Sequence, residues 1–168
     1  MIITMRIIHI LSGVAWAGGT FMMASLIEPS VRGTGPEGGK FMQYLSGPGR
    51  LTSYMMATGV FAVLSGLYLF WVRSGGFNGA WFGTGQGIAL SVGALAGIAS
   101  AVVGSVIPRS ASLEMAKIGQ QMQTAGGPPS PQLLAQMNEQ RQRLAQGGRI
   151  TALLLVIAVI GMSLNGYV

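Results

Sequence analysis

The 168-residue sequence contains no cysteine, no aspartate and a single histidine. The absence of cysteine excludes disulfides, thiolate catalysis and cysteine-based zinc or iron–sulfur sites. Without aspartate the chain cannot assemble a Ser-His-Asp triad, and one histidine cannot supply the several ligands of a zinc hydrolase. We therefore identify no catalytic side chains, and the sequence leaves open whether the protein is an enzyme.

Charged residues are also scarce. They make up 8% of the chain, whereas hydrophobic residues make up 50%, and a soluble domain usually carries about 25% charge. The acidic residues all lie at or beyond the ends of apolar runs, which excludes the paired intramembrane carboxylates of a proton transporter. The net charge of +6 comes from basic residues dispersed around those runs. This pattern favours a lipid bilayer as partner and disfavours nucleic acid.

Four apolar runs are long enough to cross a bilayer, which takes about 20 helical residues. They cover approximately residues 6–27, 51–72, 86–107 and 150–166. We expect an all-α fold, in which residues 1–168 form a single integral membrane domain built as a four-helix bundle. Residues 108–149 predict a cytoplasmic helical hairpin extension between spans three and four, with a glycine- and proline-rich hinge at 126–131.

The basic residues predict the orientation of the chain. Eight of the ten lysines and arginines lie in the segments between spans one and two and between spans three and four, while Arg6 and Arg73 lie on the other side. Because positive residues are retained in the cytoplasm, both segments are expected there and both termini outside. The expected location is the inner (cytoplasmic) membrane of a bacterium, with a multi-pass topology.

The first span carries the single histidine, His9, within a stripe of small or polar residues. His9, Ser12, Gly13 and Trp16 recur at the spacing of one helix face. We expect this face to contact other helices and the remaining faces to contact lipid. An antiparallel bundle would place residues 68–71 of the second span at the level of His9.

Two coordination chemistries are open for His9. Neutral imidazole is an axial ligand of haem iron and also, together with methionine sulfur, a ligand of copper(I). Met5 lies one turn before His9, and Met162 is the distant methionine expected at the same depth. The structural alternative is a buried histidine hydrogen-bonded to a backbone carbonyl or a serine.

The third span contains a stripe of small residues that includes Gly93 and Gly97. Such a stripe allows close contact between helices, and it would also leave room for a flat cofactor. Close helix contact further favours a homo-oligomer, in which a twofold axis could complete a site that has one ligand per chain.

The first 70 residues or so resemble two families of small membrane proteins. The motif is His9, six intervening residues, Trp16, a glycine pair, and then Pro29 and Arg32 after the span. It resembles the first helix of the copper-resistance D proteins and the HemJ-type protoporphyrinogen oxidases. The resemblance implies a bundle of four or more helices and, for the HemJ type, haem b bound through His9. The lysine expected there as the opposing ligand is absent from spans two to four.

The leading hypothesis is a membrane protein that binds haem b through His9 and serves electron transfer or haem-linked redox chemistry. Its expected cofactor-binding residues are His9, Ser12, Gly13, Trp16, Gly93, Gly97 and Met162, with His9 as the metal ligand. A copper(I)-handling protein that uses histidine and methionine ligands is the first alternative. The second is a non-catalytic accessory subunit of a larger membrane complex.

Overall fold

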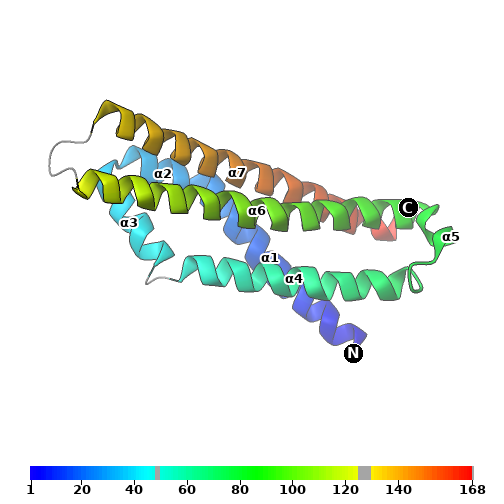
Figure 1. Cartoon of the computed structure of the whole chain (residues 1–168). Coiled ribbons are helices and arrows are strands. Elements are labelled where there is room, and N and C mark those ends of the chain that lie inside the picture. The colour runs from blue at the N-terminus through cyan, green and yellow to red at the C-terminus, as the bar shows by residue number, and fades with distance from the viewer. Residues whose placement is uncertain (48–49, 125–129, 168) are drawn as a thin grey trace.

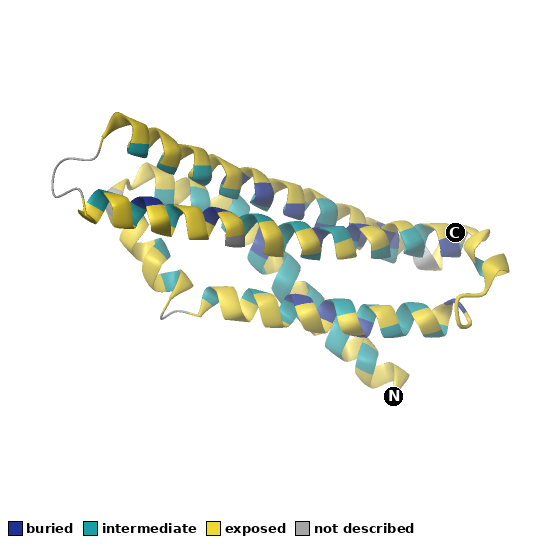
Figure 2. Ribbon diagram, viewed as in Figure 1, coloured by how far each residue is buried: buried dark blue, intermediate teal, exposed yellow. Residues whose placement is uncertain are grey.

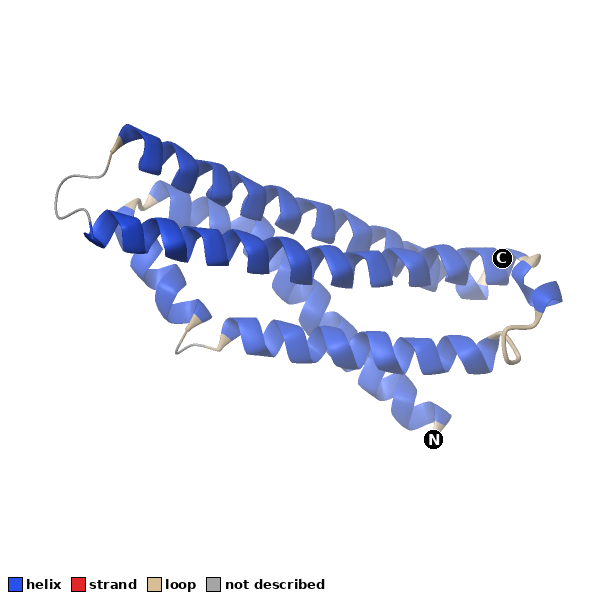
Figure 3. Ribbon diagram, viewed as in Figure 1, coloured by secondary structure: helices blue, strands red, loops and turns tan. Residues whose placement is uncertain are grey.

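The structure, a computed structural model, describes residues 1–47, 50–124 and 130–167, and all regular elements in these ranges are helical (Figure 3). Four helices in the described part of the chain are long and apolar enough to cross a membrane. The predicted all-α class and its four apolar helices are thereby confirmed. Most of the predicted hinge at 126–131 lies outside the described residues.

The first apolar helix is longer than the predicted span of residues 6–27. It consists of α1 (Ile2–Met22), a π-helical turn (Met23–Ile27) and α2 (Glu28–Gly33), which together form one continuous helix. Pro29 does not end it. The π-helical turn widens the backbone just before the proline, so its ring and its missing N–H are accommodated.

A short helix and an aromatic cluster flank the second span, at opposite ends. The helix α3 (Pro36–Ser46) precedes the span, and the span itself is α4 (Leu51–Arg73). At the other end of α4, Phe70 and Trp81 pack edge to face with ring centroids 5.4 Å apart. Trp81 belongs to the single turn α5 (Gly79–Phe82), so this cluster joins the end of α4 to the start of the third span.

The third and fourth spans are parts of longer helices. These are α6 (Gly85–Thr124), which runs through Pro108, and α7 (Pro131–Ser163), which ends in a 3₁₀ turn (Leu164–Gly166). Each helix also forms one side of the predicted hairpin at 108–149. The buried residues Ala111, Ile118 and Ala145 continue the interface between α6 and α7 beyond the apolar runs, so one packing face serves both parts.

The helices associate as two pairs. α1 packs mainly on α4, and α6 packs on α7 along its length, as Figure 1 shows. Buried residues are concentrated along these two lines of contact (Figure 2). The chain exposes 10667 Å², whereas a compact soluble monomer of this mass exposes about 7,900 Å². The exposed surface includes large apolar side chains of all four long helices, among them Leu11, Leu64, Leu95 and Leu153.

The glycine stripe of α6 lies against α7. A methyl group on Gly93 would come within 3.1 Å of the Ala158 carbonyl oxygen, and one on Gly104 would lie 3.3 Å from Thr151. Gly161 of α7 packs directly against Gly93. Of the two uses expected for this stripe, close helix packing is the one that the contacts show.

Candidate cofactor site at His9

The imidazole of His9 is held by the backbone of α4. Its Nδ1 lies 2.8 Å from the carbonyl oxygen of Ala62, and the hydroxyl oxygen of Ser65 lies 3.4 Å from the same nitrogen. A carbonyl oxygen can only accept, so Nδ1 must carry the proton in this contact. These are the hydrogen-bond partners of the structural alternative, a buried histidine bonded to a backbone carbonyl or a serine, but His9 is half-buried.

The same hydrogen bond determines what the rest of the ring can do. A neutral imidazole protonated on Nδ1 keeps its lone pair on Nε2. Among the described residues no hydrogen bond to Nε2 is found. An imidazole whose Nδ1–H is fixed by a carbonyl and whose Nε2 is free is the usual arrangement of a metal-ligating histidine. The lone pair of Nε2 is therefore available to bind a metal ion.

Two glycines of α4 allow the rings of α1 to approach its backbone. A methyl group on Gly66 would lie 2.8 Å from Cε1 of His9, and one on Gly59 would lie 3.4 Å from Cε2 of Trp16. His9 and Trp16 are seven residues apart, as are Gly59 and Gly66. This equal spacing on antiparallel helices brings each ring opposite a glycine.

The predicted stripe of α1 faces α4 only in part. His9 and Trp16 contact α4, and Thr20 on the same helix is buried. Ser12, by contrast, donates its hydroxyl to the carbonyl of Ile8 at 2.6 Å, and a methyl group on Gly13 would meet nothing within 4 Å. Ser12 and Gly13 are half-buried neighbours of His9, and the Ser12 hydroxyl also lies 3.4 Å from the backbone carbonyl oxygen of His9.

The other predicted site residues lie in the second helix pair. Gly93 and Gly97 of α6 face α7, and the backbone nitrogen of Met162 would be 3.2 Å from a methyl group on Gly93. In Figure 1 the N-terminal part of α1 emerges on the far side of α4 from α7. The structure thus joins His9 with Trp16, and Gly93 with Met162, but it does not bring these two groups together.

The depth of His9 differs from the expected level by about one turn. The ring contacts Ala62, Ser65 and Gly66, whereas residues 68–71 were expected opposite it. The close contacts of α1 with α4, down to Gly19 against Met55, keep one antiparallel register along the whole pair. His9 consequently lies about 12 Å from the Arg73 end of α4, at 1.5 Å per residue.

Comparisons with known families, curated proteins and solved structures find no match. Within the described residues there is no group of three or more histidine, cysteine, aspartate or glutamate side chains that could hold a metal ion. The chain has a single histidine, so a metal at His9 would receive one imidazole ligand from each chain.

Sequence reasoning did not identify the α4 partners of His9. Ala62 contributes only a backbone oxygen, which no residue pattern reveals. Gly66 and Gly59 did carry a signal, because their spacing equals that of the two aromatic rings of α1. A small hollow of about 110 Å³ was also not predicted; it is lined by Glu28, Arg32 and Arg149, together with Ala24 and Pro29.

Proposed function

We propose that this is an integral membrane protein that binds haem b through Nε2 of His9 and serves electron transfer or haem-linked redox chemistry. The observation that carries the proposal is the 2.8 Å contact of Nδ1 with the Ala62 carbonyl, which leaves Nε2 as the donor atom. The resemblance of the first span to haem-binding membrane proteins is a further reason, and it stays a prediction.

The residues around His9 would leave its Nε2 free to bind the iron of a haem. Ala62 orients the imidazole through its carbonyl oxygen, as hydrogen-bonded partners of ligating histidines do. Gly66 lets the ring approach α4 closely, and Trp16 lies two turns farther along the same face. Bound haem b would supply a reversible one-electron couple, while the apolar surroundings of the site would limit access of water.

A single ligand per chain makes self-association part of the proposal. A second copy can contribute the opposing His9 across a twofold axis, which one chain cannot do. The large exposed apolar surface supports such a contact, since the chain leaves about 2,800 Å² more surface open than a compact monomer of its mass. The same surface supports the accessory-subunit alternative, in which a different membrane chain covers it.

The proposed setting is the cytoplasmic membrane of a bacterium. The distribution of positive residues favours an orientation with α3 and the distal half of the α6–α7 hairpin in the cytoplasm and both termini outside. Under this orientation His9 lies in the outer half of the membrane. Electron exchange would then take place on the outer side.

Copper(I) is the second candidate because of Met5. This residue is half-buried and lies four positions before His9, so a thioether and an imidazole can project from one face of α1. Met162 belongs to the other helix pair, which leaves Met5 as the methionine best placed to join His9.

Metal and haem analysis of the full-length protein separates these functions. We expect detergent-purified protein, produced with excess haem, to show a Soret band that shifts on reduction, and about one haem per one or two chains. A Met5→Leu variant should keep this spectrum. A protein that lacks the band but binds copper(I) through Met5 supports the alternative. A protein that binds neither haem nor copper(I) and is isolated in a stable complex with another membrane chain supports the accessory subunit.

A further inference from the structure

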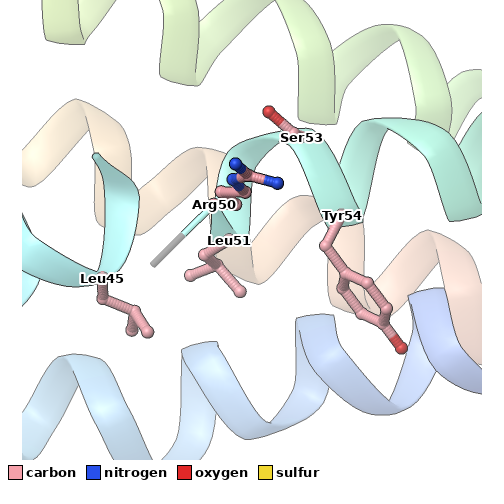
Figure 4. Close-up of a pocket in the computed structure, with 5 residues that line it drawn as sticks. All are labelled: Leu45, Arg50, Leu51, Ser53 and Tyr54. Carbon is pink, nitrogen blue, oxygen red and sulfur yellow. The ribbon is translucent and has the colours of Figure 1, made fainter. Parts of the chain in front are cut away.

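A hollow of about 520 Å³ lies at the corner between α3 and α4. Figure 4 shows its lining, in which the guanidinium of Arg50 and the hydroxyl of Ser53 lie on one side. On the other side are three largely apolar side chains, Leu45, Leu51 and Tyr54. One wall can therefore contact an anion and the other a hydrocarbon chain.

Arg50 has no partner for its charge in the described part of the chain. The sequence contains four acidic residues, and each already forms an ion pair three or four positions away on its own helix. Arg50 takes part in none of these pairs. The guanidinium is exposed, so an anion from outside the chain can reach it.

The hollow lies where a phospholipid headgroup would be found. Arg50 directly precedes α4, which is apolar enough to cross a membrane, so it stands at the boundary between polar and apolar sequence. Tyr54 is 53% exposed one turn farther on, a position typical of tyrosine at a membrane interface. α3, which provides Leu45, leaves Phe41 and Tyr44 exposed.

We propose that this hollow binds the headgroup and upper acyl chain of an anionic glycerophospholipid. Arg50 and Ser53 hold the phosphate, and the leucines and the tyrosine ring contact the glycerol backbone and the first methylenes. A soluble phosphate would leave the apolar wall without a function, and the two-sided lining therefore favours a lipid. The proposal depends on the membrane setting and is independent of haem at His9.

Lipid retention measured by native mass spectrometry tests this site on the full-length protein. We expect wild type to retain phosphatidylglycerol in preference to phosphatidylcholine, and an excess of soluble glycerol 3-phosphate not to displace it. Arg50→Asn should lower phosphatidylglycerol retention about tenfold, because a charge-assisted contact is lost. Asparagine is chosen because Arg50 has a left-handed backbone with φ 55°.

Arg141→Gln is the matched control, since it removes the same charge from an exposed position on α7 outside the hollow. It should retain phosphatidylglycerol as wild type does. Leu45→Ser leaves Arg50 intact and should lower retention about threefold, because part of the apolar wall is lost. Equal losses in the Arg50 and Arg141 variants, no loss in either hollow variant, or displacement by glycerol 3-phosphate would overturn the proposal.

Discussion

His9→Ala is expected to reduce haem retention by at least about tenfold, because even the loss of a contact that supports a metal ligand costs about 10- to 100-fold in affinity. Alanine removes Nε2, the donor atom that the Ala62 contact leaves free. The purified variant should show little Soret absorbance and a protein absorbance equal to that of wild type. Added imidazole should restore part of the band, because a free ring can occupy the space that the side chain leaves.

Ser12→Ala serves as the control for this experiment. Ser12 is a half-buried neighbour of His9 on α1, and its hydroxyl is bonded to the backbone of its own helix. Its replacement should leave the spectrum unchanged. If the His9→Ala protein kept the wild-type haem content, His9 would not be the haem ligand.

Gly161→Ala is expected to lower the free energy of unfolding by about 1–2 kcal/mol, the net of overpacking against a gain in helix propensity. The new methyl group would lie 2.7 Å from the carbonyl oxygen of Ala89 and 2.9 Å from Cα of Gly93. Both neighbours are backbone atoms of α6, so the two helices must move apart. Unfolding in mixed detergent micelles, followed by circular dichroism, measures the change.

Gly148→Ala is the matched control on the same helix. A methyl group there meets nothing within 4 Å, so only the helix propensity changes, with an expected gain of up to about 1 kcal/mol. If the two alanine variants were equally stable, α6 and α7 would not be in close contact at Gly93 and Gly161.

The elements that follow from local composition were predictable from the sequence. Long apolar runs with few charges fixed the four membrane-length helices, and the spacing from His9 to Trp16 placed both rings on one face of α1. These features depend on residue type and on the helical period alone. No tertiary information was needed for them.

Features that depend on helix pairing were not predictable. The glycine stripe of α6 signalled a close neighbour, but nothing in it selects α7 over α1, and the bundle assumed around His9 therefore included Gly93. The continuation of the first helix through Pro29 depends on a π-helical turn that no residue pattern announces. The hydrogen-bond acceptor that α4 offers to the His9 ring is a backbone oxygen, which has no signature in the sequence.

Two glycine variants of α4 test most directly whether the His9 geometry forms the cofactor site. A methyl group on Gly66 would lie 2.8 Å from Cε1 and 3.1 Å from Nδ1 of His9, and must displace the ring from Ala62. One on Gly59 would make only an ordinary 3.4 Å contact with Trp16. In reduced-minus-oxidised absorbance spectra, we predict that Gly66→Ala loses or shifts the haem bands while Gly59→Ala keeps them. Wild-type bands in both variants, at full haem occupancy, would contradict the account.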